Sequence, residues 1–140
     1  MSTFTYRIIK SSWGVHISLD AYWQPLSEFN DSSTKISEKL FFAQKSKFIT
    51  EEEAEFLKLG LKLVADKIDE LFKNKEAIVV VVQEVLFNDC DYQQEGLACA
   101  IMGWISREFN LTEPTVDVSF DRANNQYIFR FPNSEFSQKV

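Results

Sequence analysis

The sequence predicts an α+β fold, a mixed α/β domain in which two principal helices pack against a single, mainly antiparallel sheet of about five strands. Residues 77–82 are six apolar residues in a row, which is typical of a central strand covered on both faces. Residues 50–74 and 91–109 carry apolar side chains at helical spacing. Alternating stretches near both ends predict hairpins. Because no repeat, low-complexity tract or linker is visible, we expect residues 1–140 to form a single globular domain.

The first part of the chain is typical of a hairpin followed by a polar loop. Residues 3–10 and 13–20 alternate between apolar and polar side chains, and two serines separate them. We expect residues 22–25, which end in a proline, to break the second strand. Residues 27–35 are predicted to form a polar loop. For residues 36–43 the pattern leaves two alternatives open, a short strand or a helical turn.

A capping box marks the start of the first helix. Thr50 is followed by Glu53 and by further glutamates, which lie at the positive end of the helix dipole. The helix is predicted to run to about Asn74. Its apolar stripe consists of Ala54, Leu57, Leu61, Val64, Ile68 and Leu71. Gly60 costs the helix about 1 kcal/mol relative to alanine, and close contact with a neighbouring element is one reason for a glycine there.

An acidic turn and a second helix follow the central strand. The apolar pattern becomes mixed over residues 83–87, and residues 88–91 read Asn-Asp-Cys-Asp, a turn-forming sequence. Asp91 is predicted to be the N-cap of the helix, with Gln94 completing a capping box. The apolar stripe of this helix consists of Leu97, Ala98, Ile101, Met102, Ile105 and Phe109.

The last part of the chain predicts a second hairpin. Asn110 is a reasonable C-cap for the second helix, and Pro114 prevents the helix from continuing. Residues 115–120 and 126–131 alternate between apolar and polar side chains. Residues 133–140 are expected to fray.

Charge and cysteine content indicate which partners and which cellular compartment to expect. The net charge of −6 argues against nucleic acid as a direct partner, because phosphate binding needs clustered Lys and Arg. Residues 51–110 hold thirteen Asp or Glu but only six Lys or Arg. Cys90 and Cys99 form no disulfide framework and are typical of reduced thiols. The sequence shows no secretory signal pattern and no apolar run approaching 18 residues, so we expect a cytoplasmic protein with no membrane partner.

The sequence predicts no enzyme, no cofactor and no metal site. His16 is the one histidine, and it falls on the polar face of a strand, where an exposed or hydrogen-bonded role is favoured over catalysis. His16, Cys90 and Cys99 show no metal-ligand spacing. The glycines stand alone, so no phosphate-binding loop is predicted, and those of the second helix, Gly96 and Gly103, favour close packing of helix on sheet. Paired carboxylates for glycoside chemistry are left as a remote alternative.

Two groups of residues are candidates for binding a partner. The first choice is the acidic group around the turn, Glu84, Asp89, Asp91 and Glu95. It is either a solvated turn with an N-cap or a negative patch that receives a basic partner, because closely packed like charges add no stability to a fold. The second choice is an aromatic and acidic group, Asp20, Tyr22, Trp23, Glu28 and Asp31. Trp104 lies off the main stripe of its helix and is either a core residue or a partly exposed contact.

Residues 89–105 resemble a segment of small bacterial immunity proteins that accompany polymorphic toxins, including those of contact-dependent growth inhibition systems. The likeness is clearest in Tyr92-Gln93-Gln94-Glu95-Gly96-Leu97, followed by Gly103-Trp104 and Glu108-Phe109. The resemblance implies a protein that binds and neutralises a cognate toxin domain, as a monomer in a 1:1 complex rather than as a homodimer. Many such toxins are nucleases with basic clefts, which an acidic inhibitor occupies in place of nucleic acid.

A small acidic secretion chaperone is the main alternative. Chaperones of that kind dimerise and present apolar grooves to an extended segment of an effector protein. An enzyme that uses carboxylates is the third alternative. A stable dimer with exposed grooves favours the chaperone, whereas a gene directly downstream of a large toxin gene favours immunity.

Overall fold

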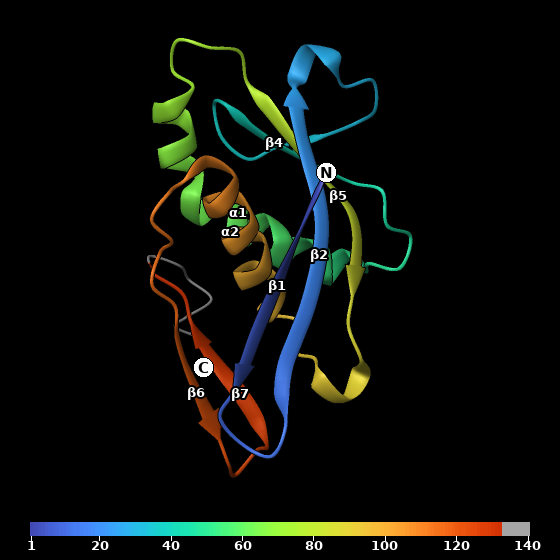
Figure 1. Cartoon of the computed structure of the whole chain (residues 1–140), viewed down its shortest axis with the longest axis vertical. Coiled ribbons are helices and arrows are strands. Elements are labelled where there is room, and N and C mark those ends of the chain that lie inside the picture. The colour runs from blue at the N-terminus through green and yellow to red at the C-terminus, as the bar shows by residue number, and fades with distance from the viewer. Residues whose placement is uncertain (133–140) are drawn as a thin grey trace.

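β5 (Ile78–Leu86) lies at the centre of a five-stranded sheet with the strand order β1-β2-β5-β4-β3 (Figure 1). The structure is a computed structural model and describes residues 1–132. Ile78 to Val82 are all buried, so the apolar run does form the central strand. The predicted α+β fold is therefore confirmed, with a mainly antiparallel sheet and two helices.

The neighbours of β5 differ on its two sides. On one side, β1 (Ser2–Ile9) and β2 (Gly14–Pro25) form an antiparallel hairpin, and β2 pairs antiparallel with β5. On the other side, β4 (Leu40–Gln44) runs parallel to β5 and carries the short edge strand β3 (Thr34–Lys35). The predicted first hairpin is thus confirmed, and the open choice for residues 36–43 is decided in favour of a strand.

β2 is longer than predicted. Residues 22–25 do not break the strand, because β5 offers them a pairing partner up to the Pro25–Ile78 pair. A proline is tolerated at a strand end, where its missing N–H interrupts no continuing ladder. The polar loop predicted over residues 27–35 is only partly present: it begins within a 3-10 turn, η1 (Leu26–Glu28), and its last two residues form β3 because they pair with β4.

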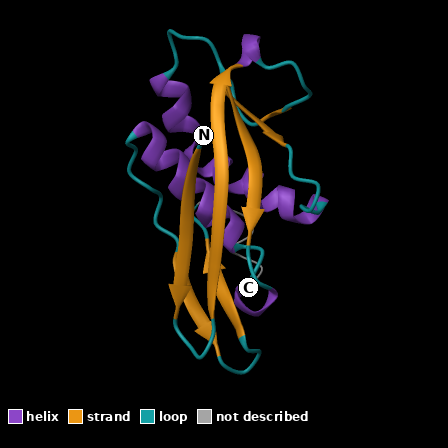
Figure 2. Ribbon diagram, turned by 45° about the vertical axis from the view of Figure 1, so that its right-hand side comes forward, coloured by secondary structure: helices purple, strands orange, loops and turns teal. Residues whose placement is uncertain are grey.

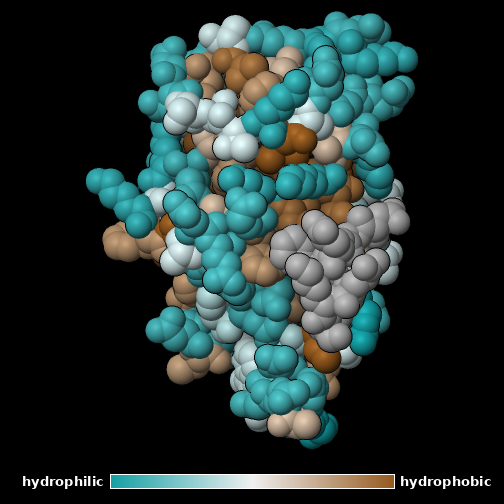
Figure 3. Space-filling model, turned by 180° about the vertical axis from the view of Figure 1, so that it is seen from behind, coloured by the Kyte–Doolittle hydropathy of each residue, from teal (hydrophilic) through white to brown (hydrophobic). Residues whose placement is uncertain are grey.

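Both helices cover the same face of the sheet. α1 (Glu51–Leu71) and α2 (Gly96–Phe109) lie together on one side of the strands (Figure 2). The core that they form includes Ile78, Val80 and Val82 of β5. Seen from the helix side, apolar surface comes to view between polar side chains in the upper half of the molecule (Figure 3).

The capping box of α1 is present as predicted. The Thr50 hydroxyl accepts a hydrogen bond from the Glu53 N–H at 3.1 Å, and the Thr50 N–H donates to the Glu53 carboxylate at 3.0 Å. The predicted stripe is buried up to Ile68, whereas Leu71 is 44% exposed at the end of the helix. Gly60 lies against α2, as its sequence position suggested: a Cβ on Gly60 would stand 2.5 Å from the Ala98 carbonyl oxygen.

The predicted cap of α2 was wrong. Asp91 belongs to a 3-10 turn, η2 (Asp89–Asp91), and α2 begins only at Gly96, with Glu95 as an N-cap whose side chain makes no capping bond. Tyr92 is extended, with φ −141° and ψ 139°. Tyr92 and Gln93 bind other parts of the fold, and these contacts prevent the helix from starting early. At the other end, Asn110 is the predicted C-cap, in the left-handed conformation at φ 55°.

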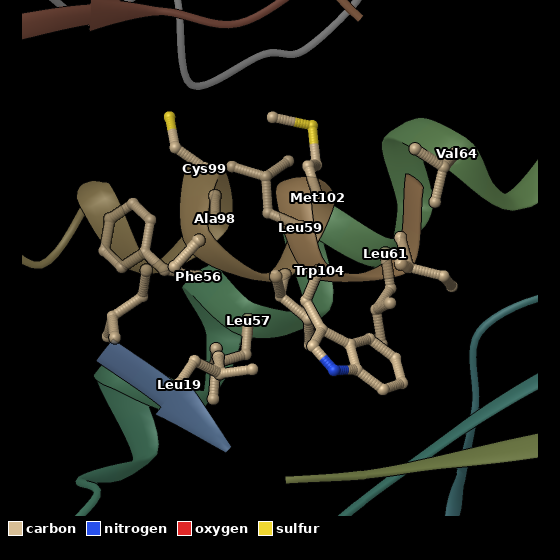
Figure 4. Close-up of a cluster of buried hydrophobic side chains, with 14 of the residues drawn as sticks. Leu19, Phe56, Leu57, Leu59, Leu61, Val64, Ala98, Cys99, Met102 and Trp104 are labelled. Atoms are coloured by element: carbon tan, nitrogen blue, oxygen red, sulfur yellow. The ribbon is translucent and has the colours of Figure 1, made fainter. Parts of the chain in front are cut away.

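Side chains of α1 and α2 interlock above the sheet (Figure 4). Leu57, Leu61 and Val64 of α1 are fully buried, as are Ala98 and Trp104 of α2. Trp104 is therefore a core residue, and its indole N–H donates to the Ser2 hydroxyl at 2.8 Å. This packing of helix on helix and helix on sheet forms the main core.

The second predicted hairpin is present as a sheet of its own. β6 (Asp117–Asp121) pairs antiparallel with β7 (Gln126–Arg130), outside the five-stranded sheet. The predicted fraying of residues 133–140 lies outside the described residues. Within residues 1–132, neither helix has the length and apolar character needed to cross a membrane.

Candidate functional site

Side chains of residues 92–97 hold this segment against the rest of the fold. The Tyr92 hydroxyl donates to the Glu53 carboxylate, and the Tyr92 ring stacks on Phe87 with a centroid distance of 3.7 Å. The Gln93 amide accepts from the Tyr127 N–H at 2.8 Å and donates to the Tyr127 carbonyl at 2.5 Å. Burial, and then the bond to Glu53, raise the pKa of Tyr92 well above its ordinary value. These contacts join the segment to α1 and to β7.

The glycines of the same segment permit close packing. A Cβ on Gly96 would lie 2.9 Å from side-chain atoms of Val15 and Ile17, and a Cβ on Gly103 would overlap the ring of Phe4. The predicted packing of helix on sheet is thereby confirmed. Tyr92, Gln93 and the two glycines therefore fix the position of the segment, and the acidic turn just before it is left at the surface.

The acidic turn itself has no partner among residues 1–132. Asp89 is exposed and Asp91 is half-buried, and neither side chain makes a hydrogen bond or an ion pair within those residues. The turn lies beside β2, near the lower end of that strand in Figure 1. Glu95 lies farther along, at the start of α2, where its backbone position ties it to the helix. The turn is thus free to meet a partner, whereas Glu95 also has a structural place.

A β-bulge brings the two predicted acidic groups together. The β2–β5 register shifts between Asp20 and Ala21, which leaves Gln83 as the extra residue of β5. Val82 faces the helices, so strict alternation would turn Glu84 to the helices as well. The bulge instead turns Glu84 to the face of the sheet that the helices do not cover, which we call the open face. There Glu84 lies directly opposite Asp20. The Thr3 hydroxyl donates to the Asp20 carboxylate.

The remaining residues of the second group are divided between the two faces of the sheet. Tyr22 lies on the open face, where the Lys45 ammonium stands 5.5 Å from its ring centroid. A hydrogen bond to Tyr22 raises the pKa of Lys45, and Asp31 adds to the effect. Glu28 is exposed in the adjoining 3-10 turn, and its carbonyl accepts from the Gln24 amide at 2.8 Å. Trp23 instead points to the helix side, so the structure does not bring it together with the other four.

Trp23 lines an apolar groove of about 430 Å³ on the helix side. Its ring lies 5.2 Å from that of Phe109 and 6.0 Å from that of Phe72. Pro25, Leu71 and Ile78 complete the apolar lining. This groove lies at the ends of α1, α2 and β2, away from the acidic turn.

Histidine and cysteine side chains make no common centre. His16 is half-buried on the open face, and both cysteines are free thiols. Cys99 is buried beside Tyr6, and burial raises the pKa of Cys99 to about 12 and raises that of Tyr6 as well. Within residues 1–132, no three His, Cys, Asp or Glu side chains gather as a metal site would require.

Leu86 and Phe48 are exposed apolar side chains that the sequence pattern did not single out. Leu86 is 55% exposed on the open face, opposite Ser18, and Phe48 is 92% exposed in the loop before α1. The mixed pattern of residues 83–87 was the available signal for Leu86, because it departs from the all-apolar run before it. No local pattern marked Phe48.

Comparison with protein-family models and with curated proteins finds no match for the chain.

Proposed function

We propose that this protein is an immunity protein, which acts in the cytoplasm by binding a cognate toxin domain, a nuclease, and covering its active-site region with an acidic surface. The observation that carries the proposal is the pairing of Asp20 with Glu84 across β2 and β5, together with the turn of Asp89 and Asp91 that lies beside β2. None of these carboxylates forms an ion pair within residues 1–132. The resemblance of residues 89–105 to immunity proteins supports the same function.

Electrostatics supports this choice of partner. Carboxylates that lie close together without cations repel each other, and a basic surface relieves that repulsion. A nuclease must bind phosphates, so its cleft carries the Lys and Arg that an acidic inhibitor needs. Long-range attraction between the two surfaces speeds their encounter. In this proposal the protein binds as a monomer in a 1:1 complex, and its activity requires no catalytic group, cofactor or metal.

The proposal predicts that a charge reversal in the turn weakens toxin binding. We expect Asp89→Lys/Asp91→Lys to slow association with a toxin domain found encoded beside the gene, and to do so most at low salt, where screening is weakest. Asp91 is suitable because it lies in the turn and not in α2, whereas Glu95 occupies the N-cap position of that helix. The measurement is the association rate and Kd at low and high salt, with the melting temperature of each variant.

The matched control is Asp66→Lys/Glu70→Lys, which makes the same change in net charge on an exposed part of α1. α1 lies on the opposite side of the sheet from Asp20 and Glu84. The control should bind as the unchanged protein does. Equal binding by both double variants at both salt concentrations would remove the turn from the interface.

The apolar groove favours a second candidate, the secretion chaperone. Trp23, Phe72 and Phe109 line a groove of the kind that holds apolar side chains of an extended peptide. A chaperone of this class is a dimer, so the mass of the purified protein in solution separates the two candidates. A stable dimer, together with failure to bind the toxin domain, favours the chaperone.

A further inference from the structure

The open face of the sheet has a covered half and a bare half. In the covered half, Val79 and Val81 are fully buried beneath a small apolar cluster. That cluster includes Leu26 and Phe29 from the segment after β2. The other half begins at the bulge, where β2 and β5 change register.

The bare half is formed by two rows of residues across β1, β2 and β5. One row is Thr5, Ser18 and Leu86, and the next is Thr3, Asp20 and Glu84. The Thr5 and Ser18 hydroxyls lie 3.0 Å apart and form a hydrogen bond with each other, so each already has a hydrogen-bond partner. We call these six residues the bare patch. Leu86, at 55% exposure, is its one aliphatic side chain.

The bulge is what places Leu86 on this surface. Without the extra residue at Gln83, alternation from Val82 would send both Glu84 and Leu86 to the helix side. With it, Val85 packs against the core instead, and Leu86 faces solvent. Bulges recur where a sheet re-aims side chains for a function. An exposed leucine beside two carboxylates gives the fold itself no evident gain.

We propose that the toxin docks on the bare patch, with Leu86 entering an apolar pocket of the toxin and an Arg or Lys of the toxin bridging Asp20 and Glu84. This inference rests on the proposed function and names the surface that performs it. Like charges directly opposite each other in a sheet destabilise it. No Lys or Arg within residues 1–132 pairs with either carboxylate. A cation from the partner therefore completes an arrangement that the chain leaves unbalanced.

Basic residues lie at both ends of the bare patch, and the acidic surface between them indicates a basic partner. Arg7 and His16 form the next row beyond Thr5 and Ser18, and Lys45 lies over Tyr22 at the opposite end. Between these basic groups the surface is acidic, and the turn of Asp89 and Asp91 continues it beside β2. A basic protein surface complements this pattern, with its apolar contact at the centre and its cations around it. Such an arrangement matches interfaces in which a central apolar anchor is shielded from water by a polar rim.

The test compares Leu86→Ser with Leu71→Ser in binding to a toxin domain found encoded beside the gene. Both leucines are exposed, but Leu86 is on the bare patch and Leu71 lines the apolar groove on the other side. We expect Leu86→Ser to weaken binding about tenfold or more, chiefly through faster dissociation, and Leu71→Ser to leave it unchanged. Both variants should keep the melting temperature of the unchanged protein.

A second pair of substitutions tests the carboxylates. Asp20→Asn/Glu84→Gln keeps an acceptor for the Thr3 hydroxyl, and it should weaken binding about tenfold at low salt and less at high salt. The effect of Leu86→Ser should not depend on salt. If the unchanged protein binds the toxin and both patch variants bind equally well, the docking surface is wrong while the proposed function stands. If the unchanged protein does not bind, the proposed function is wrong and the docking surface with it. If Leu71→Ser alone loses binding, the interface lies at the apolar groove and not at the bare patch.

Discussion

Glu53 joins the start of α1 to the segment before α2 through one carboxylate. One oxygen accepts the Thr50 N–H of the capping box, and the other accepts the Tyr92 hydroxyl. Glu53 is only 8% exposed, so the carboxylate depends on these bonds in place of water. The acidic turn precedes Tyr92 directly. Its position relative to the sheet is therefore coupled to the cap of α1.

This coupling predicts a measurable loss in Tyr92→Phe. The substitution keeps the stacking on Phe87 and removes only the hydroxyl. Since hydrogen bonds to charged groups contribute about 1.5–3 kcal/mol, we expect a loss of that order in the free energy of unfolding. Urea denaturation measures it. Tyr22→Phe is the control, because the Tyr22 hydroxyl also bonds to a charged group, but that group is the exposed Lys45, where water replaces the lost bond, so the change should stay within about 0.5 kcal/mol. Equal losses of unfolding free energy in the two variants would show that the Tyr92–Glu53 hydrogen bond contributes no more than the one at Tyr22.

At the scale of elements, the contact between α1 and α2 depends on Gly60. Alanine at this position would improve the helix by about 1 kcal/mol if the site were open. Its Cβ would instead lie 2.5 Å from the Ala98 carbonyl oxygen and from a methyl group of Ile101. A backbone oxygen of a packed helix cannot move aside cheaply. The steric conflict therefore outweighs the gain in helix propensity.

We expect Gly60→Ala to lower the free energy of unfolding by about 1–3 kcal/mol, the usual range for overpacking. Lys62→Ala is the control on the same helix, because Lys62 is exposed. It should change stability by less than about 0.5 kcal/mol. Thermal or urea unfolding of the two variants measures both changes in the free energy of unfolding. A stabilised Gly60→Ala would mean that the helices separate easily at this point.

Local pattern predicted the elements well where neighbours in sequence determine them. The capping box of Thr50 and Glu53, the run of residues 77–82 and the C-cap at Asn110 all depend on residues close in sequence, and all are confirmed. The start of α2 was missed because Gln93 bonds to Tyr127, which is remote in sequence. The continuation of β2 was missed because its partner strand supplies the pairing. Tertiary bonds overrode local preference in both cases.

At the scale of the whole molecule, the sequence predicted acidic groups but not their meeting. Asp20 and Glu84 appeared in separate groups, and only the β2–β5 register makes them neighbours. The mixed pattern of residues 83–87 indicated a change along the strand, but nothing in the sequence located the bulge at Gln83, and alternation from Val82 alone would have assigned Leu86 to the core. Trp23 was grouped with Tyr22, yet adjacent residues of a strand face opposite ways. A surface built from three strands therefore required the fold to be seen.

The same register predicts that the proposed binding surface lowers the stability of the free protein. Glu84→Gln removes one of two like charges that lie directly opposite each other, so we expect a small rise in melting temperature at low salt. The rise should shrink as salt screens the pair. Glu38→Gln, at an exposed loop position, is the matched control and should show no such rise. Calorimetry at two salt concentrations, with toxin binding measured on the same samples, gives both quantities. If Glu84→Gln raises the melting temperature and weakens toxin binding, the Glu84 carboxylate contributes to binding and not to the stability of the free protein. A fall in melting temperature, or an equal rise in the control, would contradict the idea that Asp20 and Glu84 repel each other in the free protein.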